Sequence, residues 1–157
     1  MTNIDWENVE SVSKGILELI PQQKPFRFID RIIEIDESYI TGQYTFKDDE
    51  YFYKGHFPGN PVTPGVILTE CMAQIGVCSL SCYLLLKEGF SENDSLTTLF
   101  TEADVEFLKP VLPGETVTVK AKKIFWRRKK IKCETTMFLE NGEIAAQGTL
   151  AGIGVQT

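Results

Sequence analysis

Apolar residues recur near the start of the chain at the spacing of an amphipathic helix. The residues that would share one helical face are Trp6, Val9, Val12, Ile16, Leu17 and Ile20. Pro21 follows directly and cannot continue a helix, so the pattern predicts a short helix that ends there. The next two segments, 26–36 and 38–46, are rich in β-branched and aromatic residues and predict two strands.

The segment from Gly65 to Leu86 is apolar on nearly every side. As a helix it would be about 33 Å long, enough to fill a protein core or to cross a membrane. A charge inside lipid is costly, and this segment contains Glu70 and Gln74. We therefore expect a buried core helix and no membrane insertion.

Four further strands are expected, at about 95–109, 115–126, 129–140 and 143–155. The sequence ENGE at 140–143 predicts a hairpin with a type I′ turn, because Asn141 and Gly142 tolerate positive φ angles. Two strands, one long helix and four more strands predict an α+β fold. In it an antiparallel six-stranded sheet wraps around the central helix, and residues 1–157 form one domain.

Composition adds limits to this picture. The 157 residues are 43% apolar and 24% charged, as in ordinary globular proteins. The polar, acidic start MTNIDWENVE has no secretory-signal pattern, so we expect a cytoplasmic protein. The four cysteines form no CxxC pair and the chain has a single histidine, which argues against structural zinc or a disulfide framework. Free buried thiols and no metal site are expected.

Charge is unevenly distributed. We call Lys120–Lys132 the basic segment: it has eight basic residues and no acidic one, whereas the rest of the chain has eight basic and 22 acidic residues. The basic segment could bind an acidic partner, or its side chains could simply be solvated strand faces and a turn. Phe125 and Trp126 would be stacking groups for a nucleic acid, but the acidic remainder opposes that interpretation.

The only histidine, His56, lies in a loop crowded with glycine and proline. Imidazole titrates near neutral pH and suits a general base, although a histidine satisfied in a turn is the alternative. Pro64 suits the first helical position. The amides of Gly65 and Val66 that follow would lack helical partners, and they would form an anion or oxyanion site.

Glu70 is the one carboxylate in the apolar helix. Burial should raise its pKa, so that it holds a proton, and Gln74 lies one turn later on the same face. Together with His56 this set fits proton abstraction beside a carbonyl coupled to loss of hydroxide. Glu70 lies about 7.5 Å along the helix and about 140° around it from Gly65. One protomer therefore need not bring Glu70 to its own His56.

At these residues the sequence resembles the β-hydroxyacyl-acyl carrier protein dehydratases of the FabZ/FabA type. Their pattern GHFPGxPxxPGVxxxExMAQ reads GHFPGNPVTPGVILTECMAQ here, from Gly55 to Gln74. PFRFIDRI and VEFLKPVLPGETV resemble two further family motifs. The resemblance extends from about Leu19 to Ala151.

The resemblance implies a hot-dog fold, a homodimer with a continuous sheet, and often a trimer of dimers. It implies that His56 is the catalytic base, that Glu70 acts from the partner subunit, and that Gly65 offers its amide to the thioester carbonyl. Val66 and Phe57 complete the expected substrate-binding set, with Gln74 behind Glu70. No metal or diffusible cofactor is implied, because the substrate arrives on the phosphopantetheine of an acidic acyl carrier protein. Candidate docking residues for that carrier are Lys122, Lys123, Arg127, Arg128, Lys129 and Lys130.

The sequence departs from the family where HRYPF is replaced by QQKPF, residues 22–26, which affects docking or chain-length preference near that point. The expected reaction is reversible dehydration of a (3R)-hydroxyacyl thioester to the trans-2-enoyl thioester. Two alternatives remain open. One is a hot-dog acyl thioesterase that activates water with a carboxylate, and the other is a non-catalytic acyl or carrier-protein binding module.

Overall fold

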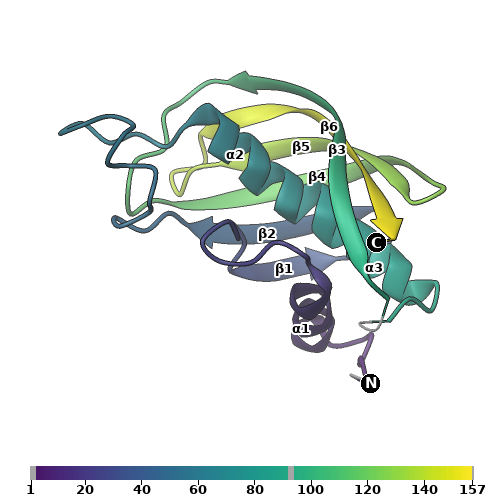
Figure 1. Ribbon diagram of the computed structural model, residues 1–157. Helices are drawn as coiled ribbons and strands as arrows, with labels where there is room; N and C mark the ends of the chain where they lie inside the picture. Colours follow the sequence, from purple (N-terminus) through teal and green to yellow (C-terminus); the bar gives the residue numbers. More distant parts are fainter. Residues whose placement is uncertain (1–2, 92–93, 157) are drawn as a thin grey trace.

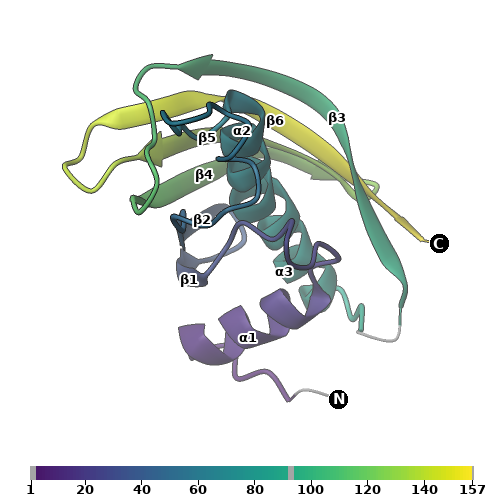
Figure 2. The same ribbon diagram turned by 60° about the vertical axis from the view of Figure 1, so that its left-hand side comes forward.

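The computed structural model describes residues 3–91 and 94–156, and it has the predicted α+β architecture (Figure 1). One antiparallel sheet has the strand order β1-β2-β4-β5-β6-β3. The strands are β1 (Arg31–Ile35), β2 (Tyr39–Thr45), β3 (Leu96–Phe107), β4 (Thr116–Arg127), β5 (Lys130–Phe138) and β6 (Ile144–Gln156). The sheet curls around a long helix that runs across its concave face (Figure 2).

The first helix, α1 (Val9–Leu19), begins one turn later than the apolar pattern suggested. Asn8 caps it, because its side-chain oxygen accepts hydrogen bonds from the amides of Glu10 and Ser11. Trp6 therefore lies outside the helix. Its ring meets that of Tyr83 edge to face, with centroids 5.7 Å apart, so it still contributes to packing.

The central helix is continuous from Gly65 to Lys87 but not uniformly α-helical. It comprises α2 (Gly65–Met72), a π-helical stretch η1 (Ala73–Cys78) and α3 (Ser79–Lys87). The amide and the hydroxyl of Ser79 both donate to the carbonyl of Gln74, five residues earlier, which widens the helix here. A Cβ on Gly76 would lie 2.9 Å from the Cβ of Ala121, so only glycine permits this closeness to β4.

This helix is the core of the domain. Its stretch Gly65–Lys87 is long and apolar enough to cross a membrane, but 78% of the apolar window is buried within the protein. Ile75 and Leu80 are fully buried, and so are Ile40, Val119 and Leu150 from the surrounding strands. Burying side chains of this size contributes roughly 1.5–3 kcal/mol each.

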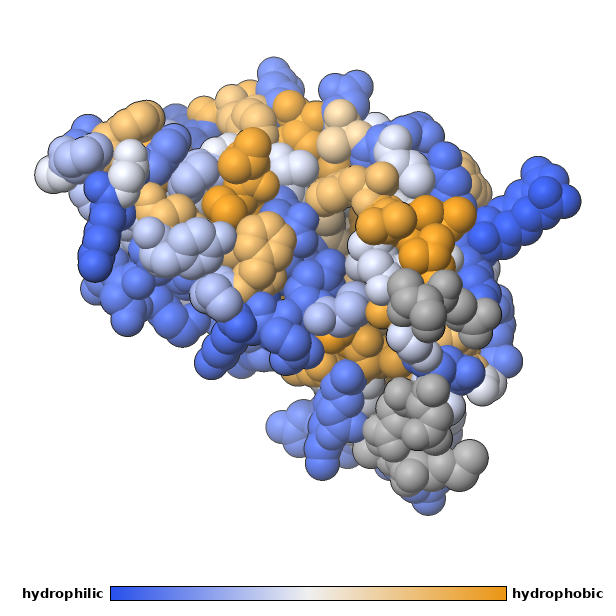
Figure 3. All heavy atoms as spheres, viewed as in Figure 1, coloured by the Kyte–Doolittle hydropathy of each residue, from blue (hydrophilic) through white to orange (hydrophobic). Residues whose placement is uncertain are grey.

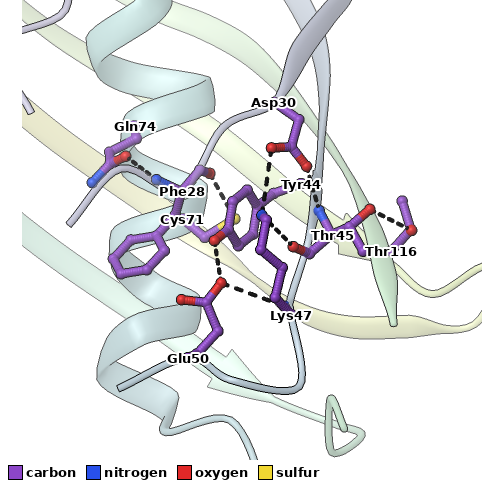
Figure 4. Close-up of polar contacts among 9 residues, drawn as sticks. All are labelled: Phe28, Asp30, Tyr44, Thr45, Lys47, Glu50, Cys71, Gln74 and Thr116. Carbon is purple, nitrogen blue, oxygen red and sulfur yellow. Dashed lines mark hydrogen bonds and ion pairs between the residues drawn. The ribbon is translucent and has the colours of Figure 1, made fainter. Parts of the chain in front are cut away.

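The first strand starts later than predicted, at Arg31 rather than Phe26. The reason is that two side chains of the central helix form hydrogen bonds with the backbone amide and carbonyl of Phe28. Its amide donates to Oε1 of Gln74 at 2.6 Å, and its carbonyl accepts from the Cys71 thiol at 3.3 Å (Figure 4). Phe28 therefore fastens the helix to this segment, and pairing with β2 resumes at Asp30, whose amide donates to the Gln43 carbonyl.

The type I′ turn predicted at Asn141–Gly142 is wrong. Only Gly142 has a positive φ there, and the Asn141 side chain accepts from the amide of Glu143 in a longer loop. Positive φ at both central positions occurs instead in the β4–β5 hairpin, where Arg128 has φ 52° and Lys129 has φ 61°. This two-residue connection has the geometry that the strand twist favours, in spite of its non-glycine residues.

The two edges of the sheet differ. β1 is short, and its pairing with β2 is irregular between Ile32 and Glu34. β3 is a 12-residue edge strand with Leu99, Phe100 and Phe107 each about half exposed. Apolar side chains gather on this face of the molecule, over β3 and the start of the central helix (Figure 3). A long apolar edge strand invites pairing with another chain.

Candidate active site

The loop holds the His56 ring in one orientation, and one hydrogen bond decides the tautomer of the ring in its neutral form. The His56 amide donates to the carbonyl of Phe52, and the His56 carbonyl accepts from the amide of Val62. Nδ1 of the ring lies 2.8 Å from the Val62 carbonyl oxygen. Because a carbonyl oxygen only accepts, Nδ1 carries the hydrogen and Nε2 of the neutral ring keeps its lone pair. Nε2 is therefore the atom that can take a proton.

Phe57 forms part of the surface around this ring. Its side chain is half exposed and stacks on His56, with centroids 4.1 Å apart. Its amide donates to the carbonyl of Asn60 at 3.2 Å. Phe57 therefore offers an apolar wall, but its amide is already engaged and is not an oxyanion donor in this structure.

The start of the central helix leaves amides unpaired. Pro64 precedes it and gives no side-chain cap, whereas its carbonyl accepts from Ile67 and Leu68. Within the described residues, no hydrogen bond is donated by the amides of Gly65 or Val66. Both amides carry the partial positive charge of a helix N-terminus, so they can stabilise a developing oxyanion.

Glu70 lies one turn further along the helix and is partly buried. Its Oε1 accepts from Nε2 of Gln74 at 2.8 Å. Burial raises the pKa of the Glu70 carboxyl above its ordinary value, and the hydrogen bond from Gln74 opposes part of that rise. The carboxyl group is thus easier to keep protonated than an exposed glutamate.

Gln74 is itself fixed by contacts far away in the sequence. Its Nε2 also donates to the carbonyl of Phe26 at 2.8 Å, and its Oε1 accepts from the amide of Phe28. The amide group therefore joins the helix to residues 26–28 while it orients Glu70. Figure 4 shows its bond with Phe28. A buried amide with all these partners is rigid, so the carboxyl group is held in place.

A pocket of about 70 Å³ begins at Glu70 and continues along one face of the helix to Ser81. Its other walls are Gln22, β3 at 98–100 and β6 at 152–154. His56 is not among the residues that line it. Among the described residues no hydrogen bond joins His56 to Glu70.

Comparison with known proteins gives the family. The family model of the FabA-like domain matches residues 20–149. This chain belongs to the FabA-like family. The FabA-like segment thus includes strands β1 to β5, the first part of β6, the His56 loop and the whole central helix, and it leaves out α1.

Two curated relatives and one solved structure are informative. The 3-hydroxyacyl-[acyl-carrier-protein] dehydratase FabZ of Caldicellulosiruptor saccharolyticus is 38% identical over 138 residues, with 87% of this chain and 93% of the relative covered. The bifunctional enzyme LpxC/FabZ of Porphyromonas gingivalis is 41% identical over 110 residues, 69% of this chain, but this match spans only 22% of that longer protein. A chain of the dehydratase heterocomplex ApeI:P from Xenorhabdus doucetiae has a TM-score of 0.76 at 16% identity, covering 90% of this chain and 91% of its own. That last similarity concerns the fold alone.

The basic segment of this FabA-like chain forms a hairpin at the far end of the molecule. Arg127 ends β4 and Lys130 begins β5, and this hairpin lies at the opposite end of the sheet from the loop before α2 (Figure 1). Lys130 is 3.2 Å from the carboxylate of Glu102, which partly neutralises it. Lys122 and Lys123 lie on β4, and the former is exposed. The expected docking residues thus spread over a strand and a turn.

Some residues of the site were not predicted from the sequence. Phe107 of β3 packs over Gly65: its ring atoms would lie 3.2–3.4 Å from a Cβ placed there. Thr98 and Gln22 line the pocket although they lie 76 residues apart. Nothing local in the sequence indicated which helix residues these side chains would meet.

The closeness of Phe107 gives a testable expectation for Gly65. Gly65→Ala should lower turnover about tenfold or more, because the new methyl group crowds the Phe107 ring beside the amide that would bind the oxyanion. Stability should change by less than about 1 kcal/mol, since alanine favours the helix and the ring is half exposed. Steady-state kinetics and urea unfolding of the same preparation would measure both. Unchanged turnover would remove Gly65 from the site.

Proposed function

We propose that this protein catalyses the reversible dehydration of (3R)-hydroxyacyl-acyl carrier protein to the trans-2-enoyl thioester. The observation that carries the proposal is that a FabA-like chain contains two groups suited to proton transfer. One is His56, whose Nδ1 bonds to the Val62 carbonyl and leaves Nε2 as the proton acceptor, and the other is a carboxyl group whose pKa burial raises. The FabZ relatives act on 3-hydroxyacyl-[acyl-carrier-protein], and the same substrate class is proposed here.

Each group has one role in the reaction. Nε2 of His56 removes the proton from the carbon next to the thioester carbonyl. Negative charge then grows on the carbonyl oxygen, where the amides of Gly65 and Val66 stabilise it. Glu70, in its protonated form, gives its proton to the departing hydroxyl group, and water leaves as the carbon–carbon double bond forms. No metal or diffusible cofactor is needed, because the proton acceptor, the proton donor and the oxyanion site are all protein groups.

The edge strand supports a site shared between two protomers. Along β3, Phe107 lies by Gly65 at the start of the central helix, whereas Thr98 lies by Cys78, further along it. If β3 pairs antiparallel with its own copy around a two-fold axis, the Phe107 end of one strand meets the Thr98 end of the other. The helix start and His56 of one protomer then approach the pocket that begins at Glu70 of its partner. A homodimer with one continuous sheet is proposed on this geometry, with a trimer of dimers as its further assembly.

The same pairing gives the basic hairpin a role. Within one protomer the hairpin is remote from its own His56, but it lies at the end of β3 that would adjoin the partner's His56 loop. An acidic acyl carrier protein bound to Arg127, Arg128 and Lys129 could then present its thioester to the partner's site. The protein is accordingly proposed to act in the cytoplasm, in fatty acid or related acyl-chain synthesis.

One assay separates this function from the two alternatives. The purified protein should hydrate a trans-2-enoyl thioester, followed by loss of enoyl absorbance, and a thiol-reactive dye should detect no released thiol. Thiol release would indicate a thioesterase. Binding of the thioester without absorbance change or thiol release would indicate a binding module.

A further inference from the structure

Polar side chains line the pocket that begins at Glu70, further along the helix than that residue. Nε2 of Gln22 donates to the hydroxyl of Thr98 at 3.1 Å. The thiol of Cys78 contacts both, at 3.6 Å from Oε1 of Gln22 and 3.8 Å from the Thr98 hydroxyl. All three residues line the pocket. We call Gln22, Cys78 and Thr98 the polar cluster.

The position of the polar cluster along the helix gives its distance from Glu70. Cys78 follows Glu70 by eight residues, which is at most about 12 Å at the rise of an α-helix, because residues 73–78 between them are π-helical. An extended chain of three bonds covers roughly 3.5 Å, as a polypeptide residue does. An acyl chain that reacts beside Glu70 and follows the helix therefore reaches the polar cluster after about ten bonds.

A longer saturated chain would have to cover polar groups that it cannot pair. The Gln22 amide has a second N–H and further acceptor capacity beyond its bonds to Thr98 and Cys78. Methylene groups laid over them exclude water without replacing its hydrogen bonds, which is unfavourable. The pocket within one protomer is also small, about 70 Å³ against a lower value of about 300 Å³ for typical small-molecule sites.

We propose that Gln22 sets the upper limit on acyl-chain length, so that chains ending before the polar cluster are preferred over longer saturated ones. Gln22 is a specificity-determining residue for the channel and takes no part in the chemistry. The inference rests on the proposed function, because it assigns the pocket to the acyl chain.

The test is the ratio of kcat/KM for a long enoyl thioester to that for a short one, about sixteen and about six carbons, which lie on either side of the limit. Gln22→Met keeps an unbranched side chain of similar length but removes the amide. We expect it to raise the ratio about tenfold over wild type, mainly through a lower KM for the long substrate. Gln22→Leu is a second variant with the same expectation, in case the first folds poorly.

Gln23→Met is the matched control, since Gln23 is the next residue, is exposed and donates to the Ile20 carbonyl outside the pocket. Its ratio should equal that of wild type. A wild-type enzyme that prefers the long substrate, or a Gln22→Met ratio within twofold of the control, would overturn the proposal. If no variant shows turnover, the proposed function fails separately. The affinities of non-reactive long and short acyl-pantetheine thioethers then decide the role of Gln22 by the same ratio.

Discussion

Replacing His56 with alanine is expected to lower enoyl thioester hydration by about 10²–10⁴-fold, the usual contribution of a positioned general base. The bond of Nδ1 to the Val62 carbonyl leaves Nε2 of the His56 ring as the atom that can accept a proton. Folding should survive, because the loop backbone keeps its own bonds from His56 to Phe52 and Val62.

Rates measured with a single enoyl thioester, alongside unfolding curves for each protein, test this expectation. Lys54→Ala is the matched control, because Lys54 is exposed in the same loop. Its rate should stay within about twofold of wild type, as expected for a surface position without a buried contact. A His56→Ala rate within tenfold of wild type would exclude His56 as the base.

Glu70→Gln should abolish most of the activity and also stabilise the protein at neutral pH. The amide cannot donate the acidic proton, so we expect a loss of about 10²-fold or more. Burial raises the folded-state pKa of Glu70, so the folded protein holds that proton more tightly than the unfolded chain does. Its stabilising contribution is complete below the unfolded pKa and is lost as pH rises through the folded pKa. Glutamine does not titrate and avoids that loss.

The difference between the two unfolding free energies isolates this carboxyl group from other titrating residues. Urea unfolding of wild type and Glu70→Gln at several pH values should show wild type losing stability relative to the variant between acid and neutral pH. A free-energy difference that stays constant with pH, or changes in the opposite direction, would show that Glu70 is not held in a desolvated site.

The sequence predicted those features of the fold that depend on local pattern. The helix from Gly65 follows from a long apolar run and the strands from strand-like segments, the first two of them rich in β-branched and aromatic residues, and the fold class is confirmed. The errors occur where distant groups decide local structure. Phe28 leaves the strand ladder because Gln74 and Cys71 bind its backbone groups. The geometry of a type I′ turn formed instead at Arg128–Lys129, because the pairing of Arg127 with Lys130 leaves two residues to connect β4 and β5.

In the candidate site, too, contacts between near neighbours in the sequence were predictable and contacts between distant segments were not. The hydrogen bond between Gln74 and Glu70 spans one helical turn, so spacing alone indicated it. The contact of Phe107 with Gly65 and the bond of Gln22 to Thr98 join segments far apart in the chain. Only the curvature of the sheet around the helix brings them together. Likewise, the sequence did not indicate the π-helical turn at Ala73–Cys78, because that turn depends on hydrogen bonds from Ser79 to the carbonyl of Gln74.

The sharing of one site by two protomers is tested most directly by mixing two inactive proteins. His56→Ala and Glu70→Gln protomers, co-expressed with different tags, should form heterodimers in which one site has both an intact imidazole and an intact carboxyl group. Random pairing makes half of the dimers mixed, with one working site of two, so about one quarter of wild-type activity should return. Isolated heterodimers with no more activity than either parent would contradict a site built from both subunits.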